Sequence, residues 1–221
     1  MYKADVWLSI GPNCRTISYL RDFGLTWFAA PSDWMIFPDL NTLLHMYRSR
    51  FFGFFKKIEE YQEPGEGPHR FLRDVRYDIA CIHHVEKQVS LKEGRIRVRR
   101  RAILRAWKTT VVLKQARNIG LVGNWSASKE ELCCFLKNFA RMYPGRKITL
   151  YNLSHVPGET GYRKTETVLS PLLSLVEYFF DDTGEQGSPD EWKGNREIWS
   201  QIIGLFRLNE TDQRINKTMG R

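Results

Sequence analysis

The sequence has few cysteines and no long apolar run, and both absences exclude broad classes of protein. Its 221 residues include four cysteines, none of them in a Cys-x-x-Cys spacing. We therefore expect reduced thiols, and neither a disulfide framework nor a zinc site. No stretch reaches the roughly 18 apolar residues of a transmembrane helix. The N-terminus also lacks the long apolar core of a signal peptide, so the predicted location is the cytoplasm.

Cofactor and metal motifs are missing as well. The chain contains neither a Walker loop nor a Gly-x-Gly-x-x-Gly pattern, and we expect no cofactor. His83 and His84 are neighbours on an extended segment, so their side chains point to opposite faces. Because no acidic residue is spaced to join them, we expect no bound metal.

The composition and the order of the elements predict an α/β fold. Apolar residues make up 42% of the chain and aromatic residues 13%, which is enough for a sizeable core. Strands alternate with helices, a pattern typical of a mainly parallel sheet flanked by helices. We predict one domain over 1–208 and a polar tail over 209–221. The predicted strands are 5–10, 77–82, 110–113 and 147–153, and the predicted helices are 14–23, 39–55, 95–108, 128–142 and 195–207. Residues 172–180 are predicted to form a helical turn and then a short strand.

Cys14 lies where the first predicted strand gives way to a helix. The apolar run Val6–Ile10 ends in a Gly-Pro-Asn turn, and helical spacing follows. The first N–H groups of a helix lack internal partners, and the helix dipole favours negative charge there. Such a position, with the positive field of Arg15, can lower a thiol pKa below its free value of roughly 8.5. The pattern indicates a nucleophile after strand one. The alternative is a small buried hydrophobe.

Further polar residues follow other predicted strands. His83 and His84 follow strand 77–82, and Asn152 and His155 follow strand 147–153. Ligands bind outside the carboxyl ends of parallel strands, so these residues are expected to meet Cys14 at one sheet edge. The alternatives are a structural histidine pair, a structural Asn152 and a His155 that belongs only to a loop.

The positive charge is concentrated in one segment. Residues Lys92 to Arg117 include ten basic side chains and one acidic one, so this segment accounts for the formal net charge of +9. Clustered arginine suits phosphate or carboxylate recognition, nucleic acid or an anionic membrane surface. A solvated helix face is the simpler alternative. No aromatic residues interleave with Arg95–Arg101 and no nucleic-acid motif is present, which argues against nucleic acid.

Several short motifs follow one another in the order of a known family. They are Ser9–Cys14, Pro31–Trp34, the pair His83 and His84, the arginine-rich segment Arg95–Leu113, and Trp192–Asn195 followed by Trp199. Over nearly its whole length the chain resembles the bacterial family described as papain-like cysteine peptidases. That family has a strand, a Leu-Gly-x-x-Cys motif, a helix and a Pro-Phe-Asp-Trp loop. Two departures are Ser32 in place of Phe and Val85 in place of an aromatic residue.

The resemblance implies a Cys–His pair. Cys14 would be the nucleophile and His83 the base, with His84 as the second candidate. Asp33, or else Asn152, would orient the imidazole. The main-chain N–H groups from Asn13 to Arg15 would form an oxyanion hole. Asp33 has the alternative role of capping a turn. Candidate substrate-binding residues are Trp34, Arg99, Arg100, Arg101 and Trp192, of which Trp192 has the alternative of a core position.

Two functions follow from these residues. The first is a cysteine-nucleophile hydrolase or acyltransferase acting on an amide, ester or thioester. Its partner would be an anionic small molecule, an acyl carrier or a glycan. The second is a non-catalytic module that binds an anionic glycan or a nucleotide-like ligand through Arg95–Arg105, with Cys14 structural.

Overall fold

A computed structural model describes residues 1–60 and 68–209, and the chain forms two compact units. The sheet unit comprises Met1–Gly11, Arg15–Phe28 and the chain from Val112 onward. The arginine unit comprises Pro12–Cys14 and Ala29–Val111. The single domain over 1–208 stays a prediction, and the predicted tail lies outside the described residues apart from Asn209.

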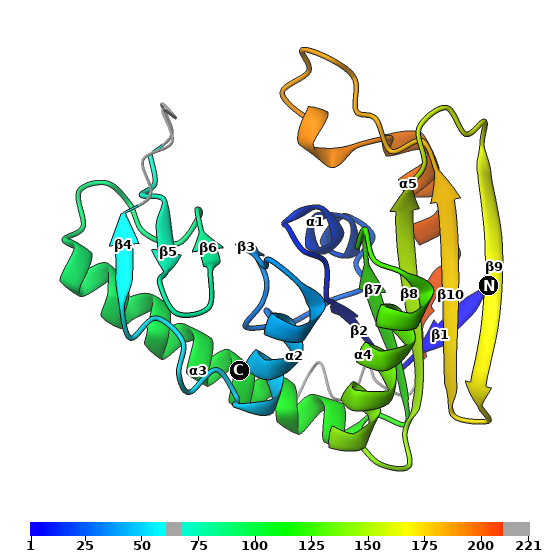
Figure 1. Cartoon of the computed structure of the whole chain (residues 1–221), viewed down its shortest axis with the longest axis horizontal. Helices are drawn as coiled ribbons and strands as arrows, with labels where there is room; N and C mark the ends of the chain where they lie inside the picture. Colours follow the sequence, from blue (N-terminus) through cyan, green and yellow to red (C-terminus); the bar gives the residue numbers. More distant parts are fainter. Residues whose placement is uncertain (61–67, 210–221) are drawn as a thin grey trace. The chain divides into compact units, whose positions relative to one another are not determined.

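The sheet unit is built on a five-stranded sheet (Figure 1). Four strands are mutually parallel, and the fifth, at the edge, runs antiparallel to its neighbour. In spatial order they are β2 (Val6–Ser9), β7 (Asn118–Gly123), β8 (Lys147–His155), β10 (Leu173–Phe180) and β9 (Tyr162–Ser170). The predicted α/β class with a mostly parallel sheet flanked by helices is confirmed.

Aromatic side chains fill one face of this sheet. Helices α1 (Arg15–Asp22) and α5 (Arg196–Ile203) contribute to that cluster. Tyr19 stacks on Trp199 with ring centroids 4.7 Å apart, and such pairs add to the free energy of burial. Helix α4 (Lys129–Met142) contacts β8 and β10, and its buried side chains lie outside the cluster. A two-stranded sheet, β1 (Tyr2–Ala4) with β11 (Phe206–Leu208), completes the unit.

The arginine unit carries a separate antiparallel sheet. Its order is β3 (Met35–Ile36), β6 (Ile79–Cys81), β5 (Leu72–Asp74) and β4 (Ile58–Glu60). Helix α2 (Leu40–Arg48) is shorter than the predicted 39–55, because Arg50 and Phe51 adopt positive φ angles that end it. Helix α3 (Leu91–Gln115) belongs to this unit as far as Val111.

Three sequence predictions are wrong in instructive ways. The predicted strand 77–82 is β6, which pairs antiparallel in the arginine unit and does not join the parallel sheet. The predicted strand 110–113 is the end of α3, where Thr110 Oγ1 donates to the carbonyl of Ala106 at 2.8 Å. That bond satisfies a hydroxyl that otherwise competes with the helix. Residues 173–180 are strand throughout, without the predicted helical turn.

Within the described residues, α3 and every other helix is too short or too polar to cross a lipid bilayer.

Candidate functional site

Cys14 directly precedes the first residue of α1, as the sequence predicted. Its side chain is buried, with 6% exposed. The carbonyl of Pro12 accepts a hydrogen bond from the Phe37 N–H at 2.9 Å, which fastens this segment within the arginine unit. Burial, and then the negative charge of Asp33, raises the pKa of the Cys14 thiol to about 11. The predicted lowering of this pKa is therefore wrong in direction, because burial and Asp33 outweigh the main-chain hydrogen bond that lowers it.

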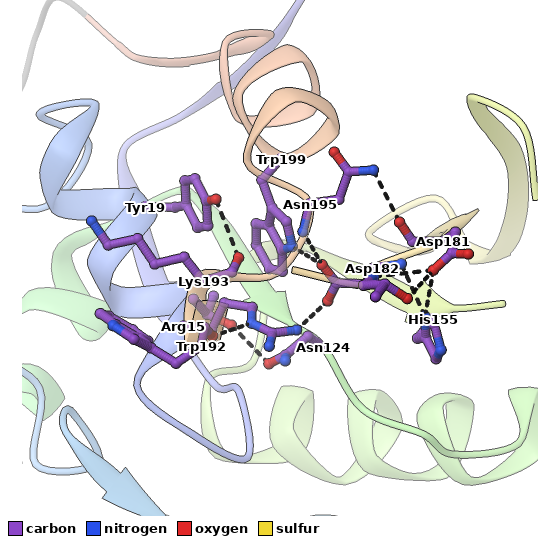
Figure 2. A network of polar contacts seen from close by, with 12 residues as sticks. Arg15, Tyr19, Asn124, His155, Asp181, Asp182, Trp192, Lys193, Asn195 and Trp199 are labelled. Carbon is purple, nitrogen blue, oxygen red and sulfur yellow. Dashed lines mark hydrogen bonds and ion pairs between the residues drawn. The ribbon is translucent and has the colours of Figure 1, made fainter. Parts of the chain in front are cut away.

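The Arg15 guanidinium interacts with residues of the sheet unit. Its guanidinium forms an ion pair with the buried carboxylate of Asp182 and donates from Nε to the main-chain oxygen of Trp192 at 2.8 Å (Figure 2). The pKa of Cys14 responds to burial, to Asp33 and to a hydrogen bond from its own main chain. The positive field that the sequence assigned to Arg15 is thus balanced by Asp182.

Asp33 is buried and uses its carboxylate locally. Oδ2 accepts a hydrogen bond from the Ala30 N–H at 2.8 Å, so the carboxylate caps its own turn. The main-chain oxygen of Asp33, by contrast, lies 3.3 Å from Nε2 of His84. Asp33 therefore meets the imidazole through its main chain, whereas the family resemblance implied a contact through the carboxylate.

His83 and His84 have different surroundings. Burial, followed by the charges of Arg105 and Arg101, lowers the pKa of His84 to about 4. His83 is exposed, and its ring packs edge-on against Trp34 with centroids 5.9 Å apart. Partial loss of water around the ring, and then the charge of the nearby His69, lower the pKa of His83 as well. His84, the second candidate for the base, is the histidine that shares Asp33 with Cys14.

A second thiol belongs to the same neighbourhood. Cys81 is buried at the end of β6, and burial raises its pKa. Negative charge on Cys14 would raise it further, whereas Arg101 and Arg105 lower it. We call these residues the thiol cluster: Cys14, Asp33, Cys81, His84, Arg101 and Arg105. The sequence analysis missed Cys81 and Arg105 as site residues, although Cys81 ends the strand that leads to the histidine pair.

The arginines of α3 fall into two groups with different surroundings. Arg101 and Arg105 are four residues apart, so they share one side of the helix and act on the thiol cluster. Arg95, Arg99 and Arg100 instead line a cavity of about 300 Å³ with Lys56. Arg99 and Arg100, which were predicted to bind substrate alongside Arg101, therefore belong to a different surface of the arginine unit.

Asn152 and Trp192 belong to the sheet unit. Asn152 is buried, and its Oδ1 accepts from the Trp125 N–H at 2.9 Å. Its Nδ2 donates to the Trp125 carbonyl at 3.0 Å and to Ser154 Oγ at 2.9 Å. The Asn152 amide thus holds the chain that follows β7. Trp192 is half-exposed and receives Lys193 Nζ over its ring, 5.6 Å from the centroid.

Asp182 is the centre of a polar network after β10 (Figure 2). Its Oδ1 accepts from the Asn195 N–H at 3.0 Å and from Trp199 Nε1 at 2.8 Å. Its own N–H donates to Nδ1 of His155 at 2.9 Å. This network fixes the segment that carries Trp192, and it makes Nδ1 of His155 an acceptor.

Outside residues 61–67 and 210–221, no group of three or more His, Cys, Asp or Glu side chains is arranged to hold a metal ion.

The chain was compared with family models, curated proteins and solved structures, and none of them matches it. The resemblance to papain-like peptidases stays a prediction.

Proposed function

We propose that the arginine unit performs acyl chemistry at Cys14, as a hydrolase or acyltransferase for an amide, ester or thioester. The observation that carries the proposal is the position of Asp33. Its charge acts on the Cys14 thiol, and its main-chain oxygen binds His84. The candidate nucleophile, Cys14, and the candidate base, His84, thus both interact with Asp33. In this proposal His84, and not His83, is the base.

The protonation states define how such a site would work. With a pKa of about 11, roughly one Cys14 in ten thousand is a thiolate at pH 7. With a pKa of about 4, His84 is neutral at that pH. A carbonyl oxygen only accepts, so the contact with Asp33 places the proton of His84 on Nε2. Nδ1 is then the nitrogen that can accept a proton, which is the form that a general base requires.

The proposed reaction starts from this neutral pair. The Cys14 thiol passes its proton to Nδ1 of His84 while the sulfur attacks the acyl carbon. The bond to the amine, alcohol or thiol then breaks, and the imidazolium returns the proton to that leaving group. Water or a second nucleophile cleaves the resulting thioester and regenerates the thiol.

Arg101 and Arg105 favour a substrate that carries negative charge. Their charges lower the pKa of His84. An anion bound beside them would offset this effect, raise that pKa toward neutrality and make His84 a stronger base. An acyl group on a phosphate-bearing carrier or an anionic glycan fits this requirement. The proposed location is the cytoplasm, where the thiol would stay reduced.

One observation favours the second candidate, a binding module without catalysis. Burial and Asp33 both disfavour the Cys14 thiolate, as expected for a structural thiol. In that case the arginines would hold an anionic glycan or a nucleotide-like ligand, and Cys14 would only fill space.

A panel of ester, thioester and peptide substrates, each with and without a phosphate group, separates the two functions. The proposal expects turnover that Cys14→Ala reduces by about a thousandfold or more, and an acyl adduct on Cys14 by mass spectrometry. Cys133→Ala, in α4, is the matched control and should retain activity. If no substrate acylates Cys14, and Cys14→Ala binds phosphorylated ligands as the wild type does, the binding module is correct.

A further inference from the structure

The outer side of α3 combines exposed apolar and basic side chains. Ile96, Arg100, Ile103 and Trp107 recur at spacings of four, three and four residues, which places them on one side of the helix. Trp107 is 66% exposed, and the adjoining Leu104 is 67% exposed. Large apolar side chains in water rarely gather on one face unless a partner covers them.

The cavity beside this face is cationic. Lys56, Arg95, Arg99 and Arg100 line it, with Ile96 and Ile103 as its apolar part. Arg95 Nη1 donates to the main-chain oxygen of Lys56 at 3.0 Å, which ties the helix to the segment just before β4. Lys56 Nζ also lies over the ring of Phe52, 5.1 Å from its centroid, and Phe52 is itself exposed.

Arg99 gives a more specific indication of the ligand. Its Nε is buried, and no acceptor within the described part of the chain forms a hydrogen bond with it. A buried guanidinium N–H without an acceptor is costly, and a phosphate oxygen is the acceptor that guanidinium groups prefer. The four cations around the cavity are opposite in sign to such a phosphate group.

We propose that this face of the arginine unit binds the phosphate headgroups of an anionic phospholipid surface. We call it the lipid face, and it comprises Phe52, Lys56, Arg95, Ile96, Arg99, Arg100, Ile103, Leu104 and Trp107. The cations hold headgroup phosphates, while Trp107 and Leu104 enter the boundary between headgroups and acyl chains. Tryptophan and basic residues on one side of a helix are typical of helices that lie in this interface.

The apolar residues favour a bilayer over a soluble phosphate compound. A free phosphate would satisfy Arg99 and its neighbours but would leave Trp107 and Leu104 in water. An anionic bilayer meets both requirements, because it offers negative headgroups and an apolar layer directly beneath them. The proposal does not depend on chemistry at Cys14, since it uses the side of α3 away from Arg101 and Arg105.

Sedimentation of the full chain with vesicles tests the proposal. We expect binding to vesicles that contain about one-third phosphatidylglycerol, little binding to phosphatidylcholine alone, and release by high salt. The double variant Arg99→Gln/Arg100→Gln should bind at least about tenfold more weakly, since each cation near the surface contributes about fivefold. Trp107→Ser should also weaken binding, and Trp107→Phe should remove an emission blue shift that the wild type shows on the vesicles.

A matched control separates the lipid face from net charge. Lys137→Gln/Arg141→Gln removes the same charge from α4 and should bind as the wild type does. Equal losses in both double variants would overturn the proposal, as would equal binding to charged and uncharged vesicles. If inorganic phosphate displaces the protein while Trp107→Ser has no effect, the face is a site for soluble phosphate instead. Circular dichroism of each variant checks that these substitutions, one of them at the partly buried Arg99, leave the fold intact.

Discussion

The main-chain oxygen of Asp33 and Nε2 of His84 lie 3.3 Å apart, and this contact fixes the imidazole without using the Asp33 carboxylate. In a Ser-His-Asp triad, the carboxylate holds the base and stabilises its positive charge. Here the carboxylate accepts from Ala30, and its charge instead raises the pKa of Cys14. The main-chain oxygen of Asp33 therefore acts on His84, and its carboxylate acts on Cys14. A substitution that changes only the side chain distinguishes the two effects.

Asp33→Asn should make Cys14 more reactive. The amide oxygen can still accept from Ala30 and the main-chain contact to His84 is unchanged, but the negative charge that raises the thiol pKa is lost. We expect this pKa to fall below about 11 and the alkylation rate at pH 8 to rise about three- to tenfold. Peptide mass spectrometry gives the rate for each cysteine. Asp39→Asn, at the N-cap of α2, should leave the rate at Cys14 unchanged. A slower reaction in Asp33→Asn would support a carboxylate that assists the thiol.

Arg101→Gln should raise the pKa of His84. Burial is the largest cause of the low value, so the pKa should move from about 4 only part of the way toward 6.5. The direction follows because removing a neighbouring cation favours the imidazolium. An NMR titration of the His84 ring measures the change. Arg100→Gln is the matched control, because Arg100 lines the cavity of the lipid face and should leave this titration unaltered. Equal shifts in the two variants would mean that α3 acts only through its total charge.

Local patterns in the sequence were sufficient for part of this structure. The apolar run before the Gly-Pro-Asn turn correctly placed Cys14 at the start of a helix. Ser128 and Glu131 form the capping box that the sequence predicted at the start of α4. Both features depend on residues within a few positions of one another, so a single sequence contains the information.

The pairing of strands that are distant in the chain could not be predicted from the sequence in the same way. Strand β6 has three residues and pairs with β3, some 45 positions earlier in the chain, and so short a strand carries no decisive periodicity. Thr110–Leu113 has a strand-like composition, but it continues a helix that starts at Leu91. Tertiary packing overrides such weak propensities.

The same contrast between local patterns and long-range packing applies to the candidate site. Alternation along an extended segment predicts opposite orientations for His83 and His84, but the two residues lie in a bend after β6. The sequence also cannot say which of them is the less exposed. The burial of Cys14, which reverses the expected pKa shift, likewise depends on side chains distant in sequence.

His84 should make the protein less stable as the solution becomes acidic. Its pKa is about 4 in the folded chain and near 6.5 when unfolded, so the unfolded chain binds more protons between these values. The free energy of unfolding should therefore fall by about 3 kcal/mol from pH 7 to pH 4 on this account alone. Urea denaturation at several pH values measures the slope. His84→Gln should reduce it, while His83→Gln, at an exposed position, should retain most of it; equal slopes in all three proteins would exclude His84 as the source.

Asp182 should contribute far more to stability than its neighbour Asp181. The Asp182 carboxylate is buried and binds Arg15, Trp199 Nε1 and the Asn195 N–H. Asp182→Ala removes these acceptors at once and leaves the partly buried Arg15 without its counter-charge, so we expect a loss of roughly 3–5 kcal/mol in urea denaturation. Asp181→Ala removes hydrogen bonds to Gly158 and Thr183 at a more exposed position and should cost much less. Equal stability of the Asp181→Ala and Asp182→Ala variants would show that the network in Figure 2 does not hold the carboxyl edge of the sheet together.

Gly194 gives a second test of the same network. It has a φ of 69°, and a Cβ there would lie 2.1 Å from Asp182 Oδ1. Gly194→Ala should therefore reproduce part of the loss of stability expected for Asp182→Ala.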